Sequence, residues 1–315
     1  MSHTRTRTEF GIPPDLLRGP GADFLPLAGE ANWGMVWAGL DQLRELAKGQ
    51  LIRVAGIDTG VDDKHPDMRN LKDAADFTGS RIGPRDAHGH GTHISGTIGA
   101  TDPRIGVCAA GIELYHGKGL GDSGSGSGQA IQGAMQWAAS QGCEVISMSL
   151  GSSGEDTRIT GFMGELAEAG VWVVAAAGNS GPNTGNVDWP GRSPHCVSVA
   201  ALNPDFTPAS FSSAGSKIDT AGPGVNIWSC RPGGGYQQMS GTSMATPWIA
   251  GVLALYRAAL KKAGLPIPKI DGVRRMLGVD STDVYEKGID RRTGPGALLP
   301  LLLTMNVEAD PPPVA

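Results

Sequence analysis

The segment IRVAGIDTG, residues 52–60, is an apolar run of strand length that ends on an acidic residue set between glycines. Near-continuous apolar character is typical of a strand that is covered on both faces of its sheet. Further segments of this kind lie at residues 112–116, 145–149, 171–177 and 197–202. We therefore expect a largely buried sheet, with Asp58 just beyond the end of its first strand.

Helix-length amphipathic segments separate these strands. The expected helices cover residues 39–48, a stretch that begins near His90, and residues 129–141, 158–169, 243–262 and 269–277. Regular alternation of strand and helix is typical of a parallel sheet with crossover helices. The sequence thus predicts one α/β domain with a mainly parallel central sheet.

The bulk composition narrows the classes of function. Of the 315 residues, 40% are hydrophobic and 18% are charged, as in an ordinary globular protein. The net charge of −5 and the lack of a Lys/Arg cluster indicate that nucleic acid is not a partner. No apolar run has the length of a membrane span or a signal peptide, so we expect a cytoplasmic protein that does not bind membranes.

The cysteines form no CxxC pair, and the sequence therefore contains neither a zinc knuckle nor a redox motif. Buried free thiols are expected, although the even count leaves disulfides open. The four are Cys108, Cys143, Cys196 and Cys230.

Three islands of polar residues flanked by glycine lie at the ends of the expected elements, and they hold Asp58, His90 and Ser243. A serine hydroxyl is a weak nucleophile until an imidazole takes its proton, and the imidazole needs a carboxylate to orient it. A fourth island, AAAGNSG (175–181), carries Asn179, whose amide can donate to a developing oxyanion. The sequence thus supplies every group of an acyl-transfer site.

The order of these groups separates the hydrolase folds. None of the seven histidines follows Ser243, which excludes the order found in α/β-hydrolases. The order His, Asp, Ser belongs to paired β-barrels, which the alternation of strand and helix does not fit. The order Asp, His, Ser remains, and it is the order of subtilisin.

Five segments resemble signatures of the subtilisin-like serine protease family, in the order of the family. They are VAGIDTGVDDKHPDM, DAHGHGTHISGTIGA, VISMSLG, VVAAAGNSG and MSGTSMATPWIAG. The resemblance covers about residues 33–299, and it implies a three-layer α/β/α fold and a serine endopeptidase that needs no cofactor for its chemistry. Its partners would be protein or peptide substrates, while the oligomeric state stays open.

The same resemblance implies roles for individual residues. Asp58 becomes the orienting carboxylate, His90 the general base and Ser243 the nucleophile, while His93 is structural. Asn179 and the backbone N–H of Ser243 become the oxyanion donors. The resemblance also implies a substrate cleft. One wall of its pocket would be formed by Ser149, Leu150 and Gly151, and the other by Ala176, Ala177 and Gly178. The GDSGSGSG loop, with Gly124 and Gly126, would form an edge strand that pairs with substrate.

Asp188 precedes the segment WPG (189–191), at a place where small residues are common in the family. A carboxylate in a partly desolvated pocket favours a cationic partner, which predicts a preference for Lys or Arg before the scissile bond. The alternative is that Asp188 turns toward solvent.

Asp67, in HPDM, matches a family ligand of a structural calcium ion, and the loop 101–107 has the expected length. Pro103, however, stands where an Asn side chain usually helps, and calcium requires six to eight oxygens. Two interpretations stay open: a calcium site, or a carboxylate that only caps a turn.

The layout is closest to that of intracellular subtilisins. We expect an N-terminal extension at residues 1–32, a peptidase domain at 33–305 and a disordered proline-rich tail at 306–315. The extension is interpreted either as an inhibitory segment that lies across the active site or as a disordered terminus. Two other functions remain open on the same fold, a peptide transamidase or cyclase and a catalytically silent binding protein.

Overall fold

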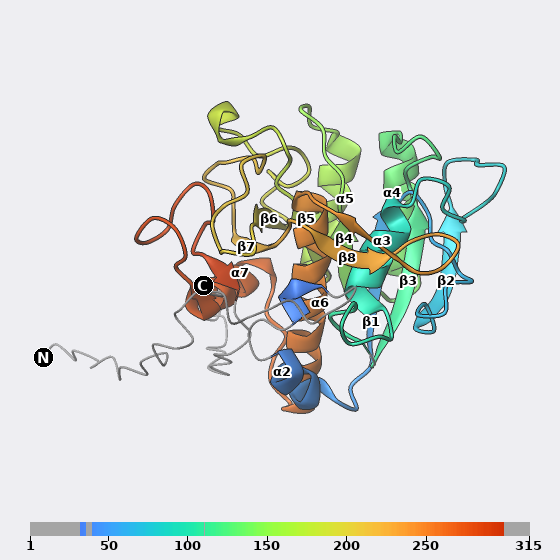
Figure 1. Cartoon of the computed structure of the whole chain (residues 1–315), viewed down its shortest axis with the longest axis horizontal. Coiled ribbons are helices and arrows are strands. Elements are labelled where there is room, and N and C mark those ends of the chain that lie inside the picture. The colour runs from blue at the N-terminus through green and yellow to red at the C-terminus, as the bar shows by residue number, and fades with distance from the viewer. Residues whose placement is uncertain (1–31, 36–39, 110, 299–315) are drawn as a thin grey trace, which may run out of the picture.

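A computed structural model describes residues 32–35, 40–109 and 111–298 (Figure 1). The tail predicted at 306–315 lies outside these residues, and so does the predicted extension except for Asn32. The predicted peptidase domain is described as far as residue 298, apart from residues 36–39 and 110.

A nine-stranded sheet forms the centre of the molecule, in the order β10-β11-β7-β6-β5-β4-β1-β3-β2. All neighbouring strands run parallel except β10 and β11. The strands are β1 (Ile52–Asp58), β2 (Leu71–Asp76), β3 (Ile112–Lys118), β4 (Val145–Met148), β5 (Trp172–Ala176), β6 (Val197–Leu202), β7 (Thr220–Pro223), β10 (Ser281–Thr282) and β11 (Ala297–Leu298). Two further strands, β8 (Ile227–Cys230) and β9 (Tyr236–Met239), form a separate antiparallel hairpin.

Helices cover both faces of the sheet. One face carries α2 (Leu40–Ala47), α3 (His90–Gly99), α6 (Thr242–Lys262) and α7 (Ile270–Asp280), whose buried side chains share one core cluster. The other face carries α4 (Gly128–Ser140) and α5 (Thr157–Glu168) with a second cluster. Two short 3₁₀ helices, η1 (Trp33–Met35) and η2 (Pro182–Thr184), complete the elements of the described residues. The predicted three-layer α/β/α fold is confirmed.

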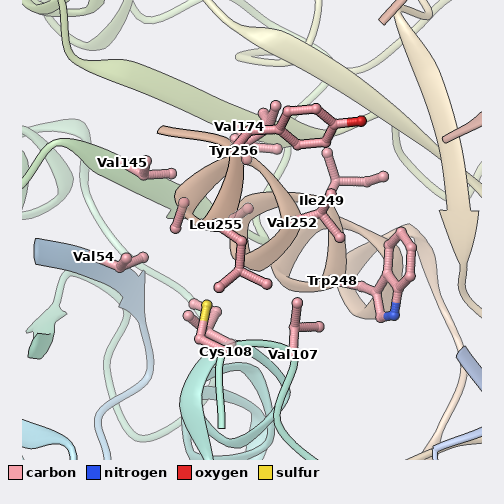
Figure 2. Close-up of a cluster of buried hydrophobic side chains, with 14 of the residues drawn as sticks. Val54, Val107, Cys108, Val145, Val174, Trp248, Ile249, Val252, Leu255 and Tyr256 are labelled. Carbon is pink, nitrogen blue, oxygen red and sulfur yellow. The ribbon is translucent and has the colours of Figure 1, made fainter. Parts of the chain in front are cut away.

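Strand β5 illustrates why the strands read as apolar runs. Trp172 and Val174 pack into the cluster around α6, and Val173 and Ala175 pack into the cluster around α4 and α5. Because successive side chains point to opposite faces, a strand between two helical layers must be apolar at every position. Figure 2 shows this packing on the α6 side, where residues of that helix face Val54, Val145 and Val174.

The elements predicted from apolar runs are present, with ends that differ by one or two residues in most cases and by three at the end of α7. The sequence did not predict β2, β7, the β8–β9 hairpin or the two-residue strands β10 and β11. Segments such as LKDAAD and YQQM mix polar and apolar residues without alternation. The GDSGSGSG loop was expected to be an edge strand that pairs with substrate backbone. In the free chain it holds a turn and no assigned strand, and its last residue before α4, Ser127, is extended.

All four cysteines are buried and free, as expected. In the part of the chain that the structure describes, no helix combines the length and the apolar composition needed to cross a bilayer.

Candidate active site

Asp58 and His90 meet where β1 ends and α3 begins. His90 Nδ1 lies 2.7 Å from Asp58 Oδ1, and the backbone N–H of Thr59 donates to the same oxygen at 2.8 Å. Asp58 is fully buried. Because a carboxylate can only accept, Nδ1 carries the proton, and Nε2 of the neutral ring is left as a base.

The surroundings of His90 raise the pKa of its imidazole above 6.5. Burial alone would lower this pKa, but the negative charge of Asp58, the hydrogen bond to Asp58 and the charge of Asp86 outweigh it. The ring is therefore a stronger base than a free histidine, and it is ready to accept a proton at pH values above its pKa.

Ser243 is the second residue of α6, and two reciprocal hydrogen bonds join it to Ser149. The hydroxyl of Ser149 donates to the carbonyl of Ser243 at 2.8 Å, and the hydroxyl of Ser243 donates to the carbonyl of Ser149 at 3.3 Å. The first bond has a cause in the sequence: Pro247, four residues later, has no N–H to offer the Ser243 carbonyl. Ser149 thus replaces the missing helical hydrogen bond.

Among the described residues no hydrogen bond joins Ser243 to His90. Such catalytic hydrogen bonds are often long or poorly aligned in free enzymes and tighten when substrate binds. To reach His90, the Ser243 hydroxyl must give up its hydrogen bond to the Ser149 carbonyl.

The side-chain amide of Asn179 has a fixed orientation. Its Oδ1 accepts from the backbone N–H of Thr242 at 2.9 Å and from the Thr242 hydroxyl at 3.1 Å. Because an N–H donor must face the oxygen end of the amide, Nδ2 is the end that remains able to donate. The Thr242 hydroxyl in turn accepts from the N–H of Gly178 at 3.2 Å, which locks the arrangement.

A cleft of about 590 Å³ runs past His90. Of the residues predicted for substrate binding, those that line it are Gly124, Gly126, Ser149, Leu150 and Gly151. The other predicted wall, Ala176, Ala177 and Gly178, is not part of this lining. The sequence did not indicate that Asp156, Ile159 and Trp189 also line the cleft.

Asp188 lies between the two predicted pocket walls. A Cβ added to Gly178 would stand 2.2 Å from Asp188 Oδ2, and one added to Gly151 would stand 3.2 Å from Asp188 Cβ. Gly178 also has a φ of +102°, so both its conformation and its neighbour require glycine. Within the described residues no hydrogen bond or ion pair reaches the Asp188 carboxylate. Burial raises its pKa, and the charge of Arg192 offsets this only in part.

The residues around Asp67 do not fit a calcium ion. Asp67 Oδ1 accepts from the hydroxyl of Thr101 at 3.1 Å, and Oδ2 accepts from the hydroxyl of Tyr236. Its other neighbours are a ring nitrogen of His65 and the sulfur of Cys230, whereas calcium takes oxygen ligands.

Asp86 is a buried residue of the site that the sequence did not single out. One oxygen accepts from Thr59 Oγ1 at 2.9 Å and from the N–H of Gly89 at 2.8 Å, and the other accepts from the N–H and hydroxyl of Thr92. The Thr59 hydroxyl also accepts from the N–H of Gly91 at 2.9 Å. Asp86 therefore ties the residue after Asp58 to the first turn of the helix that carries His90. Its position four residues before HGTH was the only available signal.

Lys118 also connects segments around Asp58 and His90. Its ammonium group is fully buried, donates to the carbonyls of Thr59 and Arg85, and pairs with Asp122 Oδ1 at 2.8 Å. It thereby connects the end of β1, the loop before His90 and the loop at the edge of the cleft.

We expect Asp86→Asn to shift the acid limb of kcat/KM to lower pH by a few tenths of a unit. The negative charge of Asp86 helps to raise the pKa of His90, so its removal lets the neutral imidazole persist to more acidic pH. Stability should also fall by about 2 kcal/mol, because charge-assisted hydrogen bonds are lost. A pH series of kcat/KM, with a thermal melt, measures both effects. An unchanged acid limb with a lowered melting temperature would reduce Asp86 to a structural residue.

Comparison with known proteins identifies the family. The profile of the subtilase family matches residues 49–296. M-protease of Shouchella clausii strain KSM-K16 is 40% identical over 277 residues, which cover 85% of this chain and 70% of that protein. Subtilisin E of Bacillus subtilis strain 168 and subtilisin of Bacillus pumilus are each 42% identical over 212 residues, or 66% of this chain. The match spans 55% of subtilisin E, about half its length, and 77% of the Bacillus pumilus subtilisin. The chain therefore belongs to the subtilase family of subtilisin-like serine proteases.

Proposed function

We propose that this subtilase is a serine endopeptidase that cleaves after Lys or Arg, with Ser243 as nucleophile and Asp188 as the residue that selects the side chain. The observation that carries the proposal is the convergence of separate motifs at one edge of the sheet. Asp58 meets His90 at 2.7 Å, and Asn179 meets the residue before Ser243 at 2.9 Å. Labelling of Ser243 by a fluorophosphonate tests the catalytic part.

In the first half of the reaction, Ser243 Oγ attacks the carbonyl carbon of the scissile peptide bond while His90 Nε2 takes the hydroxyl proton. Asp58 keeps the ring in the required tautomer and stabilises the imidazolium. The carbonyl oxygen becomes an oxyanion that accepts from Asn179 Nδ2 and from the N–H of Ser243. This N–H lies in the first turn of α6, where backbone donors have no intrahelical partner.

The second half releases the product and restores the enzyme. His90 gives its proton to the leaving amine, the peptide bond breaks, and an acyl group remains on Ser243. Water then attacks the acyl carbon with His90 as base, and the intermediate collapses to the free acid and the Ser243 hydroxyl.

Asp188 supports the preference for a basic residue before the scissile bond. Its carboxylate lies against Gly151 and Gly178, one residue from each pocket wall, and is without an ion-pair partner among the described residues. The pKa of Asp188 is raised because burial outweighs the charge of Arg192, which forms no ion pair with it. A substrate ammonium or guanidinium group would supply that ion pair.

Asp188→Asn should lower kcat/KM for peptides with Arg or Lys before the scissile bond by about 10- to 100-fold, since one charge-assisted contact is lost. Peptides with Phe or Leu at that position should be cleaved as well as before or better. Asp156→Asn is the control, because Asp156 is a carboxylate that lines the cleft but already pairs with Arg158 at 2.7 Å. An equal loss for all peptides, or a wild type that prefers only Phe or Leu, contradicts the assignment.

A further inference from the structure

A cluster of three potential metal ligands lies apart from the cleft. One ring nitrogen of His65, a carboxylate oxygen of Asp67 and the sulfur of Cys230 all lie within 4.8 Å of one another. His65 and Asp67 belong to the turn that follows β1, and Cys230 ends β8. We propose that this cluster is a structural site for a thiophilic divalent cation such as Zn²⁺, which ties β8 to the turn.

The donor set determines the class of ion. Thiolate sulfur, imidazole nitrogen and carboxylate oxygen are the ligands of zinc and its soft relatives, whereas calcium and magnesium take oxygen alone. Tetrahedral zinc holds ligand atoms about 3.3 to 3.8 Å apart, so the cluster must contract by no more than about 1 to 1.5 Å. The Tyr236 hydroxyl, which is hydrogen-bonded to Asp67, or a water molecule supplies the fourth ligand.

The hydrogen bonds of His65 fix the tautomer that such a role needs. Nε2 lies 2.8 Å from the carbonyl of Gly235, and Nδ1 lies 3.1 Å from the N–H of Asp67. A carbonyl can only accept and an N–H can only donate, so Nε2 carries the proton and Nδ1 has the free electron pair. Liganding histidines characteristically give their other N–H to a backbone carbonyl in this way. Nδ1 would therefore be the ligand atom, and it would have to give up the hydrogen bond that it accepts from the N–H of Asp67.

The thiol of Cys230 lies in a negative and apolar environment. It is fully buried, and no hydrogen bond from another of the described residues reaches its sulfur, whereas the thiols of Cys108 and Cys196 each donate to a backbone carbonyl at 3.4 Å.

A divalent cation would bind at this cluster with loss of the thiol proton. It bonds to the sulfur, the S–H bond breaks, and the proton leaves to water, so that the thiolate and the nearby carboxylates are neutralised together.

An ion at this place would also steady the candidate active site. Strand β8 packs against α3, because His93 Nε2 lies 2.9 Å from the carbonyl of Ile227 and the Ser229 hydroxyl donates to the carbonyl of His93 at 2.8 Å. The helix held in this way begins at His90. Asp58 ends β1 and His90 begins α3. An ion that links β8 to the turn after β1 would therefore connect the two elements that carry these residues.

Cobalt(II) is the probe of choice, because a cobalt–thiolate bond gives a charge-transfer absorption that calcium and oxygen ligands do not. The full chain is used with Ser243→Ala, so that self-cleavage does not interfere. We expect one equivalent of Co²⁺ to produce this band, and a hundredfold excess of Zn²⁺ over its Kd to raise the melting temperature by about 5 °C. Both effects should disappear in Cys230→Ser and persist in Cys108→Ser, whose thiol is equally buried.

Two further variants keep the test decisive. Tyr236→Phe releases Asp67 from its hydrogen bond and should retain the band. His65→Gln should raise the Kd for Co²⁺, measured from this band, at least tenfold. Metal-free melts of every variant show that each is folded before metal is added. The proposal is overturned if the parent gives no band, if Cys230→Ser gives an equal one, or if Ca²⁺ stabilises the chain and Zn²⁺ does not.

Discussion

Ser243→Ala is expected to abolish peptide hydrolysis, with kcat falling by about 10⁶-fold, the loss that the equivalent change causes in subtilisin. The methyl group cannot attack a carbonyl, and His90 then has no hydroxyl proton to accept. Covalent labelling by a fluorophosphonate should vanish completely, because the probe requires the serine oxygen.

The control for this change must leave the site untouched. Ser140→Ala serves, because Ser140 lies at the exposed end of α4 and its hydroxyl bonds only to the carbonyl of Trp137 among the described residues. Substrate binding should survive in Ser243→Ala, since neither Asp188 nor the cleft walls change. Residual hydrolysis near the wild-type rate in Ser243→Ala would exclude Ser243 as nucleophile. A wild type that neither labels nor cleaves would exclude the endopeptidase itself.

The sequence predicts those parts of the molecule that depend on short segments. Apolar runs predict β1 and β5 because both faces of these strands meet helices, and the glycine-flanked islands identify Asp58 and His90 because each lies at the end of its own element. Strands such as β2 and β9 escape prediction because their exposed polar residues follow no period of two.

Contacts between distant segments explain what the sequence could not predict. Asp86 is an ordinary loop residue until the chain folds and brings Thr59 within 2.9 Å of it. The cluster of His65, Asp67 and Cys230 likewise requires β8 to lie beside the turn after β1. Asp188 is intermediate: its place before WPG suggested the pocket, but only the gap between Gly151 and Gly178 locates its carboxylate.

The hydrogen bond between Ser149 and Ser243 depends both on a local sequence signal and on a contact between distant segments. Pro247 lies within the motif MSGTSMATP, and its missing N–H can be read directly from the sequence. The hydroxyl that compensates for it belongs to Ser149, at the end of a different strand. The motif therefore leaves the Ser243 carbonyl without a helical donor, and the fold determines which residue donates to it.

Asn179→Asp should lower kcat by at least 10²- to 10³-fold with little change in KM, a loss of the size known for an oxyanion donor of subtilisin. The aspartate keeps an oxygen for the N–H and hydroxyl of Thr242, so the local fold is retained. Its other oxygen, however, cannot donate and repels the developing oxyanion. Asn179→Ala removes the repulsion, and its kcat should lie between those of Asn179→Asp and the wild type.

A matched change at Thr242 separates donation from orientation. Thr242→Val removes the hydroxyl but keeps the backbone N–H that fixes Asn179 Oδ1 at 2.9 Å, so we expect less than a tenfold loss of kcat. Single-turnover acylation rates for the variants at Asn179 and Thr242, together with their melting temperatures, distinguish the two effects. If Thr242→Val is as damaging as Asn179→Ala while both remain folded, the orientation of the amide and not its donated hydrogen bond limits the reaction. If Asn179→Asp retains full activity, the oxyanion is stabilised by other groups.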